Sequence, residues 1–143
     1  MNKPIILDAG PLGRIAHPRP KREIALWLEQ MLAAGVEIII PEIADYEVRR
    51  NLLLAGLTKS VERLDHLKQF LTYLPLNTSV MMKAAQLWAE ARRAGQPTAD
   101  PKEMDCDVIL AAQALEADAV VVTENIGHLS RFVVAQHWRD VKL

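Results

Sequence analysis

The sequence predicts an α/β fold in which helices cover both faces of a parallel β-sheet. Short apolar runs alternate with longer segments whose apolar residues recur at helical spacing, which is typical of strand–helix–strand units. The clearest runs, residues 5–7 and 119–122, are unbroken, as expected for strands that are covered on both faces. No Pro-, Gly- or Ser-rich linker divides the chain, so residues 1–143 are predicted to form a single domain.

Five segments are predicted to be strands, because they are short and rich in β-branched or other apolar residues. They are residues 5–7, 36–40, 72–76, 119–122 and 131–135. The third contains Pro75, which weakens that prediction because proline cannot donate a hydrogen bond to a neighbouring strand. The fifth is expected to be a short edge strand, followed by a turn that contains Trp138.

Six segments are predicted to be helical, from apolar residues at helical spacing and from the residues that begin and end them. They are residues 9–16, 23–34, 42–55, 59–71, 80–94 and 105–115. Gly35 and Gly95 follow two of these segments, at the position where glycine commonly ends a helix. Ser79 stands where it can cap the fifth segment. The sixth is rich in alanine, so it can approach the sheet closely.

Composition and charge exclude several classes of protein. The 143 residues are 50% hydrophobic and 24% charged, which is typical of a soluble globular protein. The formal net charge of -1 gives no overall attraction for nucleic acid, so such contacts require a local basic patch. No apolar run approaches the ~20 residues of a membrane span, and no signal peptide is expected. Cys106 is the only cysteine, which excludes an intramolecular disulfide and favours a cytoplasmic location; we interpret it as a small buried hydrophobic residue.

Asp8 ends the first strand, at the position where open α/β sheets bind their ligands. An aspartate here can also cap the helix that follows, because aspartate is a favourable N-cap residue. This stretch alone does not distinguish the two roles. A ligand-binding role is favoured only if other acids converge on Asp8.

Glu47 lies near the start of the segment 42–55, between Tyr46 and Val48, so it is expected to border the buried side of that helix. Asp45 is two positions away, about 200° around the helix, and cannot easily face the same point. An acid in the first turns of a helix is also a favourable partner of the helix dipole without any further role. Glu47 is therefore preferred to Asp45 as the functional candidate.

Asp105 and Asp107 open the alanine-rich helix, and the same geometry allows at most one of them to face a given site. Asp107 is the better candidate, because an apolar segment follows it directly. Asp100 with Pro101 and Glu103 fits a capping box with proline at the first helical position. A helix that begins there would put Glu103 one turn before Asp107, as a supporting ligand.

The segment Thr123-Glu124-Asn125 follows the strand predicted at residues 119–122. Its place at the carboxyl end of a strand makes it a candidate fourth wall of a site that contains Asp8. Without the other acids, a polar turn would explain the segment equally well.

Four motifs, in this order, resemble those of the PIN-domain nucleases, and within them the VapC-type toxins of prokaryotic type II toxin–antitoxin pairs. They are Leu7-Asp8, Glu47-Val48-Arg49-Arg50, residues 107–114, and Val122-Thr123-Glu124-Asn125 with His128-Leu129 after it. Together they span nearly the whole chain in the right order and with typical spacing.

The resemblance implies a three-layer α/β/α sandwich around a central parallel sheet, with the active site at the carboxyl ends of the strands. In the family, acids at the positions of Asp8, Glu47 and Asp107 bind a divalent metal ion. Asn125 matches a polar position after the late strand that is sometimes aspartate. The implied activity is a Mg²⁺-dependent (Mn²⁺ would also serve) endoribonuclease that leaves 5′-phosphate and 3′-hydroxyl ends. The implied partners are RNA, a cognate antitoxin and a second copy in a homodimer, in the cytoplasm.

The chemistry of the acids supports the same interpretation. Hard divalent cations prefer oxygen ligands, and such a cation can activate water and stabilise the charge that develops in phosphodiester hydrolysis. Clustered carboxylates without a cation repel one another and raise their pKa values, so a cluster is hard to explain as structure alone. Nearby basic residues are expected, as a group, to hold the RNA backbone. They are Arg14, Arg19, Lys21, Arg22, Arg49 and Arg50.

Two departures from the family pattern leave an alternative open. Ala9 and Gly10 supply no hydroxyl or amide where the family commonly has Ser, Thr or Asn, and Asn125 is neutral. Both features fit a catalytically weak or inactive PIN-like module that binds RNA or protein. Two other α/β classes with an acid at a strand end fit less well. A phosphatase would need an acid two residues after Asp8, where Gly10 stands, and a phospho-receiver would need an aspartate near Leu76, where none is present.

The segment 42–71 has more apolar side chains than one buried helix face needs. They are Leu52, Leu53, Leu54, Leu57, Leu64 and Leu67. We expect them either to pack in the core or to form a surface for the dimer or the antitoxin.

Overall fold

A computed structural model describes residues 3–95 and 101–143, apart from the side chains of residues 101–103. Within this part of the chain, the strands are β1 (Ile5–Leu7), β2 (Ile38–Pro41), β3 (Thr72–Leu74), β4 (Val120–Val122) and β5 (Ala135–Gln136). They form one sheet in the order β3-β2-β1-β4-β5, and every neighbouring pair is parallel. Strand β1 is therefore central, and the strands' carboxyl ends share the edge where Asp8 lies.

The side chains of the strands alternate between two hydrophobic layers. Ile5 and Leu7 pack in one layer, whereas Ile6 packs in the other. Ile5 lies level with Ile38 of β2 and with Val120 of β4. All three residues of β1 are buried, which explains why the strand is an unbroken apolar run in the sequence.

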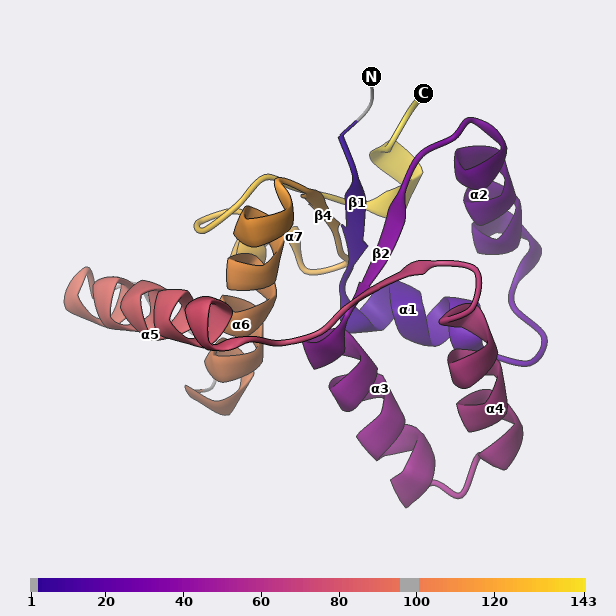
Figure 1. Ribbon diagram of the computed structural model, residues 1–143, viewed down its shortest axis with the longest axis horizontal. Coiled ribbons are helices and arrows are strands. Elements are labelled where there is room, and N and C mark those ends of the chain that lie inside the picture. The colour runs from indigo at the N-terminus through magenta and orange to yellow at the C-terminus, as the bar shows by residue number, and fades with distance from the viewer. Residues whose placement is uncertain (1–2, 96–100) are drawn as a thin grey trace.

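Helices cover both faces of the sheet and complete the predicted three-layer fold (Figure 1). One layer contains α1 (Ala9–Ala16), α2 (Arg22–Ala33), α4 (Thr58–Leu67) and much of α3 (Glu42–Leu54). The other contains α6 (Pro101–Ala117) and α7 (Ile126–Leu129), and α5 (Thr78–Arg93) packs on α6. No helix in the described part of the chain is long and apolar enough to cross a membrane.

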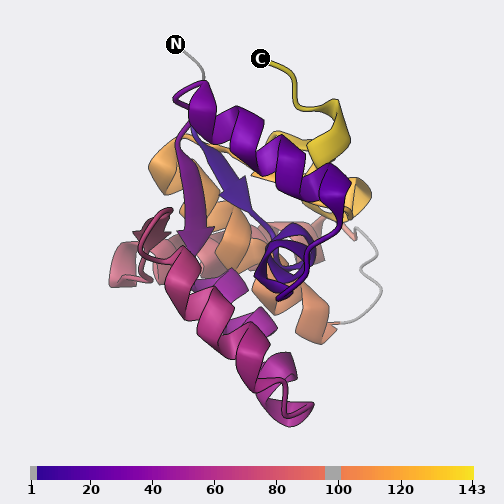
Figure 2. The same cartoon turned by 90° about the vertical axis from the view of Figure 1, so that its right-hand side faces the viewer.

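The C-terminal segment is anchored on α2, as Figure 2 shows. Trp138 begins the 3₁₀ turn η1 (Trp138–Asp140), and its ring centroid lies 6.2 Å from that of Trp27 in α2. Arg139 Nε lies 2.8 Å from Glu23 Oε1 of the same helix. These contacts hold η1 against α2, and the chain then ends beside Lys3 and Ile5, at the amino end of β1.

Three local predictions are corrected by the structure. Among residues 131–135 only Ala135 lies in a strand, because α7 ends at Leu129 and the side chains of Phe132 and Val133 pack against the helices from a loop. The cap of α5 is Asn77 rather than Ser79, since the Asn77 side chain accepts a hydrogen bond from Val80 N. The helix α6 begins at Pro101, where the capping-box alternative puts it, rather than at Asp105; Asp100 and the side chain of Glu103 lie outside the described residues.

Gln113 joins three elements in the interior. Its side chain is fully buried; Nε2 donates a hydrogen bond to Leu74 O of β3, and Oε1 accepts one from Ile43 N in the first turn of α3. The N–H groups of a helix's first turn have no partner within the helix. Gln113 satisfies one of them and so fixes the start of α3, which carries Glu47, against α6, which carries Asp107.

The leucines of residues 42–71 divide between core and surface. Leu64 and Leu67 are buried, and Leu52 packs against the same core. Leu53, Leu54 and Leu57 are exposed near the turn that joins α3 to α4, with Leu54 at 89%. We call these three residues the α3–α4 tip.

Candidate functional site

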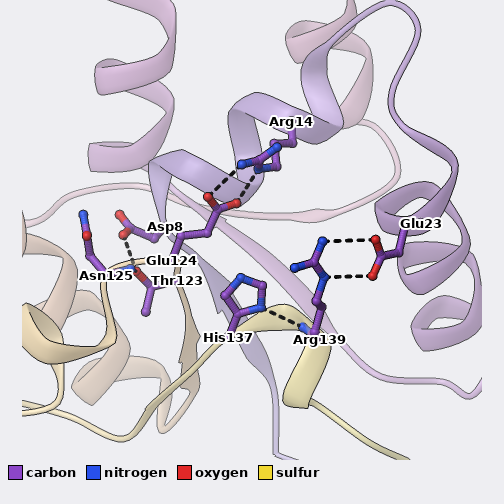
Figure 3. Close-up of polar contacts among 8 residues, drawn as sticks. All are labelled: Asp8, Arg14, Glu23, Thr123, Glu124, Asn125, His137 and Arg139. Atoms are coloured by element: carbon purple, nitrogen blue, oxygen red, sulfur yellow. Dashed lines mark hydrogen bonds and ion pairs between the residues drawn. The ribbon is translucent and has the colours of Figure 1, made fainter.

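Asp8 both caps α1 and stands at the carboxyl end of the central strand. Its Oδ1 accepts a hydrogen bond from Ala9 N at 2.8 Å, and its Oδ2 accepts one from Thr123 Oγ1 at 2.8 Å (Figure 3). Burial raises the pKa of Asp8, and these two hydrogen bonds partly oppose that rise. The two roles that the sequence left open are therefore compatible in one side chain.

The electrostatic environment of Glu47 indicates that three predicted acids lie near one another. Glu47 is half-buried on α3, and its pKa is raised to about 7, chiefly by burial. The negative charges of Asp8, which follows β1, and of Asp107 on α6 raise this pKa further, whereas Arg50 and a hydrogen bond with Cys106 lower it. Glu47 is thus within electrostatic range of both other predicted acids.

Helix α6 contributes Asp107, which is half-buried, whereas Asp105 is exposed. Asp107, but not Asp105, acts on Glu47, as the helical spacing predicts for acids two residues apart. Cys106 packs against a hydrophobic layer and also contacts Glu47; burial is the main cause that raises its pKa to about 11. Among the described residues, no three His, Cys, Asp or Glu side chains already stand close enough to hold a metal ion.

The segment after β4 contributes Thr123 and Asn125 in different ways. Thr123 is fully buried, and its hydroxyl donates to Asp8 while accepting a hydrogen bond from Asn125 N at 2.8 Å. Asn125 is exposed, immediately precedes α7, and does not cap that helix with its side chain. The sequence singled out this segment, but only the fold reveals that Thr123 orients Asp8 directly.

Glu124 is a site residue that the sequence did not single out by itself. Its carboxylate forms a two-pronged ion pair with the Arg14 guanidinium, in which Nη2 and Oε2 lie 3.0 Å apart. Arg14 lowers the pKa of Glu124, and the charge of Glu124 raises that of Asp8. A Cβ atom at Gly10 would lie 3.8 Å from Glu124 Cδ, so the Glu124 side chain packs over Gly10.

Two of the basic residues expected to hold RNA are engaged in ion pairs within the chain. Arg14 pairs with Glu124, and Arg49 pairs with Asp45 and Asp65 at 3.0 and 2.7 Å. Asp45 is buried, and it also accepts a hydrogen bond from the Tyr73 hydroxyl at 3.1 Å. Asp45 therefore belongs to a structural network, unlike Glu47.

The pH dependence of stability provides a test of the Glu47 environment. The ordinary pKa of glutamate is 4.5, and in the folded protein that of Glu47 is about 7. Below pH 4.5 the carboxyl is protonated in both states. Between pH 4.5 and 7 the unfolded state releases this proton while the folded state retains it, so stability falls as the pH rises and levels off above pH 7. Metal-free protein should lose about 1–2 kcal/mol of unfolding free energy between pH 5 and pH 8, after allowance for solvent screening of a half-buried group.

Glu47→Gln should remove most of this loss, as measured by urea denaturation with a chelator present. Glu29→Gln, at an exposed position of α2, is the matched control and should follow the wild-type profile. An undiminished loss in Glu47→Gln would mean that Glu47 does not carry the repulsion.

A comparison with protein families matches the PIN domain over residues 5–132. No curated protein sequence matches the chain significantly. The family match includes Asp8, Glu47, Asp107 and Asn125.

Solved structures share the fold at low sequence identity. FitAcB from Neisseria gonorrhoeae matches with a TM-score of 0.75 and 23% identity, over 96% of this chain and 99% of that chain. VapBC2 from Rickettsia felis, bound to a DNA fragment from its promoter, matches with a TM-score of 0.77 and 18% identity, over 94% of this chain and 98% of that chain. VapBC-1 from nontypeable Haemophilus influenzae matches with a TM-score of 0.72 and 17% identity, over 95% of this chain and 98% of that chain. At these identities the likeness establishes the fold alone.

Proposed function

Because this chain belongs to the PIN domain family, we propose that it is a divalent-metal-dependent endoribonuclease that hydrolyses RNA phosphodiester bonds. The observation that carries the proposal is the environment of Glu47, whose carboxylate is affected by the charges of both Asp8 and Asp107. Acids that repel one another in the free protein are stabilised when a cation binds among them. Their arrangement at the carboxyl ends of parallel strands also suits a ligand site.

The donor set suits Mg²⁺ or Mn²⁺, because Asp8, Glu47 and Asp107 supply only carboxylate oxygens. A bound ion would activate the attacking water and stabilise the charge that develops on the phosphate. Among the described residues no three acids already form a closed group, so the carboxylates would have to approach one another to hold the ion together.

The protein itself would orient the carboxylates. Thr123 and Ala9 N hold the two oxygens of Asp8, and Gln113 holds the start of α3, on which Glu47 lies. Asn125, whose backbone N–H donates to Thr123 Oγ1, would supply a neutral polar side chain that holds water or phosphate rather than a charged ligand. Ala9 and Gly10 add no side-chain donor, so Asn125 would be a main polar contact outside the acids.

We further propose that the chain is the toxin of a toxin–antitoxin pair, acts in the cytoplasm and forms a homodimer. The likeness to VapBC and FitAcB supports the antitoxin partner. The exposed leucines of the α3–α4 tip supply an apolar surface for the antitoxin or for the second copy. A free cysteine that contacts Glu47 is consistent with a reducing compartment.

Cleavage of a mixture of structured and single-stranded RNAs tests the proposal. We expect cleavage with Mg²⁺, loss of cleavage with EDTA, and recovery when excess Mg²⁺ or Mn²⁺ is restored. The products should carry 5′-phosphate ends, which a 5′-phosphate-dependent exonuclease can verify. Cleavage that persists in EDTA would contradict the metal mechanism. Absence of cleavage with either ion, together with retained binding of RNA or protein, would favour the inactive PIN-like module.

A further inference from the structure

A groove of about 590 Å³ runs from the start of α1 to the C-terminal turn. Gly10, two residues after Asp8, lies in its lining, so the groove adjoins the candidate metal site. Its charged lining consists of Arg14, Arg19, Lys21, Arg139, Glu23 and Glu124. Four cations and two acids leave a positive balance in a protein whose formal net charge is -1. A polyanion that reaches Asp8 could therefore lie along this groove.

Two ion pairs link the elements that line the groove (Figure 3). Arg14 of α1 pairs with Glu124 after β4, and Arg139 of η1 pairs with Glu23 of α2. Both pairs are two-pronged. In the second, Arg139 Nε lies 2.8 Å from Glu23 Oε1 and Arg139 Nη2 lies 3.1 Å from Glu23 Oε2. The Arg139 and Glu23 side chains are 59% and 60% exposed, and ion pairs this exposed are weak enough to be exchanged for another anion.

We propose that this groove binds the phosphate backbone of single-stranded RNA, and that Glu124 and Glu23 occupy, in the free protein, the places on Arg14 and Arg139 that two phosphates take. The guanidinium fork binds carboxylate and phosphate with the same two-pronged geometry. The nature of the polyanion rests on the proposed ribonuclease function, whereas the exchange of carboxylate for phosphate rests on the two observed pairs.

The histidines of the groove add hydrogen-bond donors for such a backbone. His17 Nδ1 accepts a hydrogen bond from Arg19 N at 3.0 Å, and His137 Nδ1 accepts one from Arg139 N at 3.1 Å. With Nδ1 as the acceptor, Nε2 carries the proton and can donate to a phosphate oxygen. With Arg19 and Lys21 they extend the phosphate-binding groups beyond the two arginines. A backbone of evenly spaced phosphates suits this arrangement better than an acidic peptide does.

Binding of a fluorescein-labelled single-stranded RNA 12-mer tests the proposal without cleavage. Each protein carries Asp8→Asn, and fluorescence anisotropy is measured with EDTA present. Glu124→Gln and Glu23→Gln should each tighten binding about two- to fivefold, because an arginine is freed, whereas Arg14→Gln and Arg139→Gln should weaken it. The logarithmic salt dependence should become steeper by about 0.7 for each freed arginine.

Asp118→Asn is the matched control, since it removes the same charge from an exposed ion pair, with Lys3, at the amino end of the sheet. It should change the affinity less than about twofold. In the Arg14→Gln background, Glu124→Gln should lose most of its effect. Unchanged or weaker binding by both glutamine variants, or a gain that persists without Arg14, would overturn the proposal.

The outcomes separate this inference from the ribonuclease proposal. If Mg²⁺-dependent cleavage is normal but RNA affinity does not change in the ion-pair variants, the proposed role of the groove is wrong and the ribonuclease proposal stands. Responsive RNA binding without cleavage supports the groove and contradicts the enzyme. If a poly-glutamate peptide of matched length shows the expected responses and the RNA does not, the occupant is an acidic peptide and the RNA proposal is wrong.

Discussion

Asp8→Asn is expected to reduce Mg²⁺-dependent RNA cleavage at least about 100-fold while the fold is retained. The substitution removes a carboxylate from the proposed metal site. An asparagine oxygen can still accept the hydrogen bond of Ala9 N or of Thr123 Oγ1, and asparagine is as good an N-cap as aspartate. Because burial opposes the charge of Asp8, its removal should not lower stability.

Initial cleavage rates at saturating Mg²⁺ measure this effect, and the midpoint of urea unfolding checks the fold. Asp118→Asn is again the control, because it exchanges the same groups at the opposite end of the strands and should cleave at the wild-type rate. If Asp8→Asn retains more than a tenth of the activity while folded, Asp8 is not an essential ligand.

Asp45→Ala is expected to have the opposite profile: a loss of about 2–3 kcal/mol in unfolding free energy with cleavage retained by the folded protein. The Asp45 carboxylate is buried and accepts hydrogen bonds from Arg49 and Tyr73, with Lys68 Nζ at 3.8 Å. Its removal leaves these partly buried groups without the carboxylate that they share. This loss of unfolding free energy is small for a broken buried ion pair, because Arg49 retains its ion pair with Asp65.

Urea denaturation measures the loss, and cleavage is measured at a temperature where both proteins are folded. Asp65→Ala removes the exposed partner of the same arginine and should cost less than about 1 kcal/mol. If folded Asp45→Ala fails to cleave RNA at the Mg²⁺ concentration used for the wild-type protein, this network positions the site as well as stabilising the protein.

Together with Glu47→Gln, these variants separate two acids that lie two residues apart on one helix. Asp45 faces a network that needs its charge, whereas Glu47 faces two other acids that repel it. We therefore expect stability to depend on Asp45 and cleavage to depend on Glu47. The rotation of about 200° between the two positions accounts for this division.

Strand and helix types were largely predictable because they depend on local patterns. The apolar runs of β1, β2 and β4 identify buried strands, and their alternation with helices predicts a parallel sheet, in which the structure then places β1 at the centre. The errors lie where packing overrides pattern. Phe132 and Val133 pack from a loop although they are apolar and β-prone, and α7 is a single turn that no sequence periodicity reveals.

The sequence by itself determined which acids are candidates and that each belongs to a different part of the fold, since Asp8, Glu47 and Asp107 are recognisable from position and order. Their metal-binding role stays a prediction. Only the tertiary structure decided which side chains meet. Thr123 meets Asp8, and Glu124 meets Arg14, across more than one hundred residues of chain, because parallel pairing of β1 with β4 aligns their carboxyl ends. Such contacts depend on the register and direction of paired strands, which no local stretch of sequence contains.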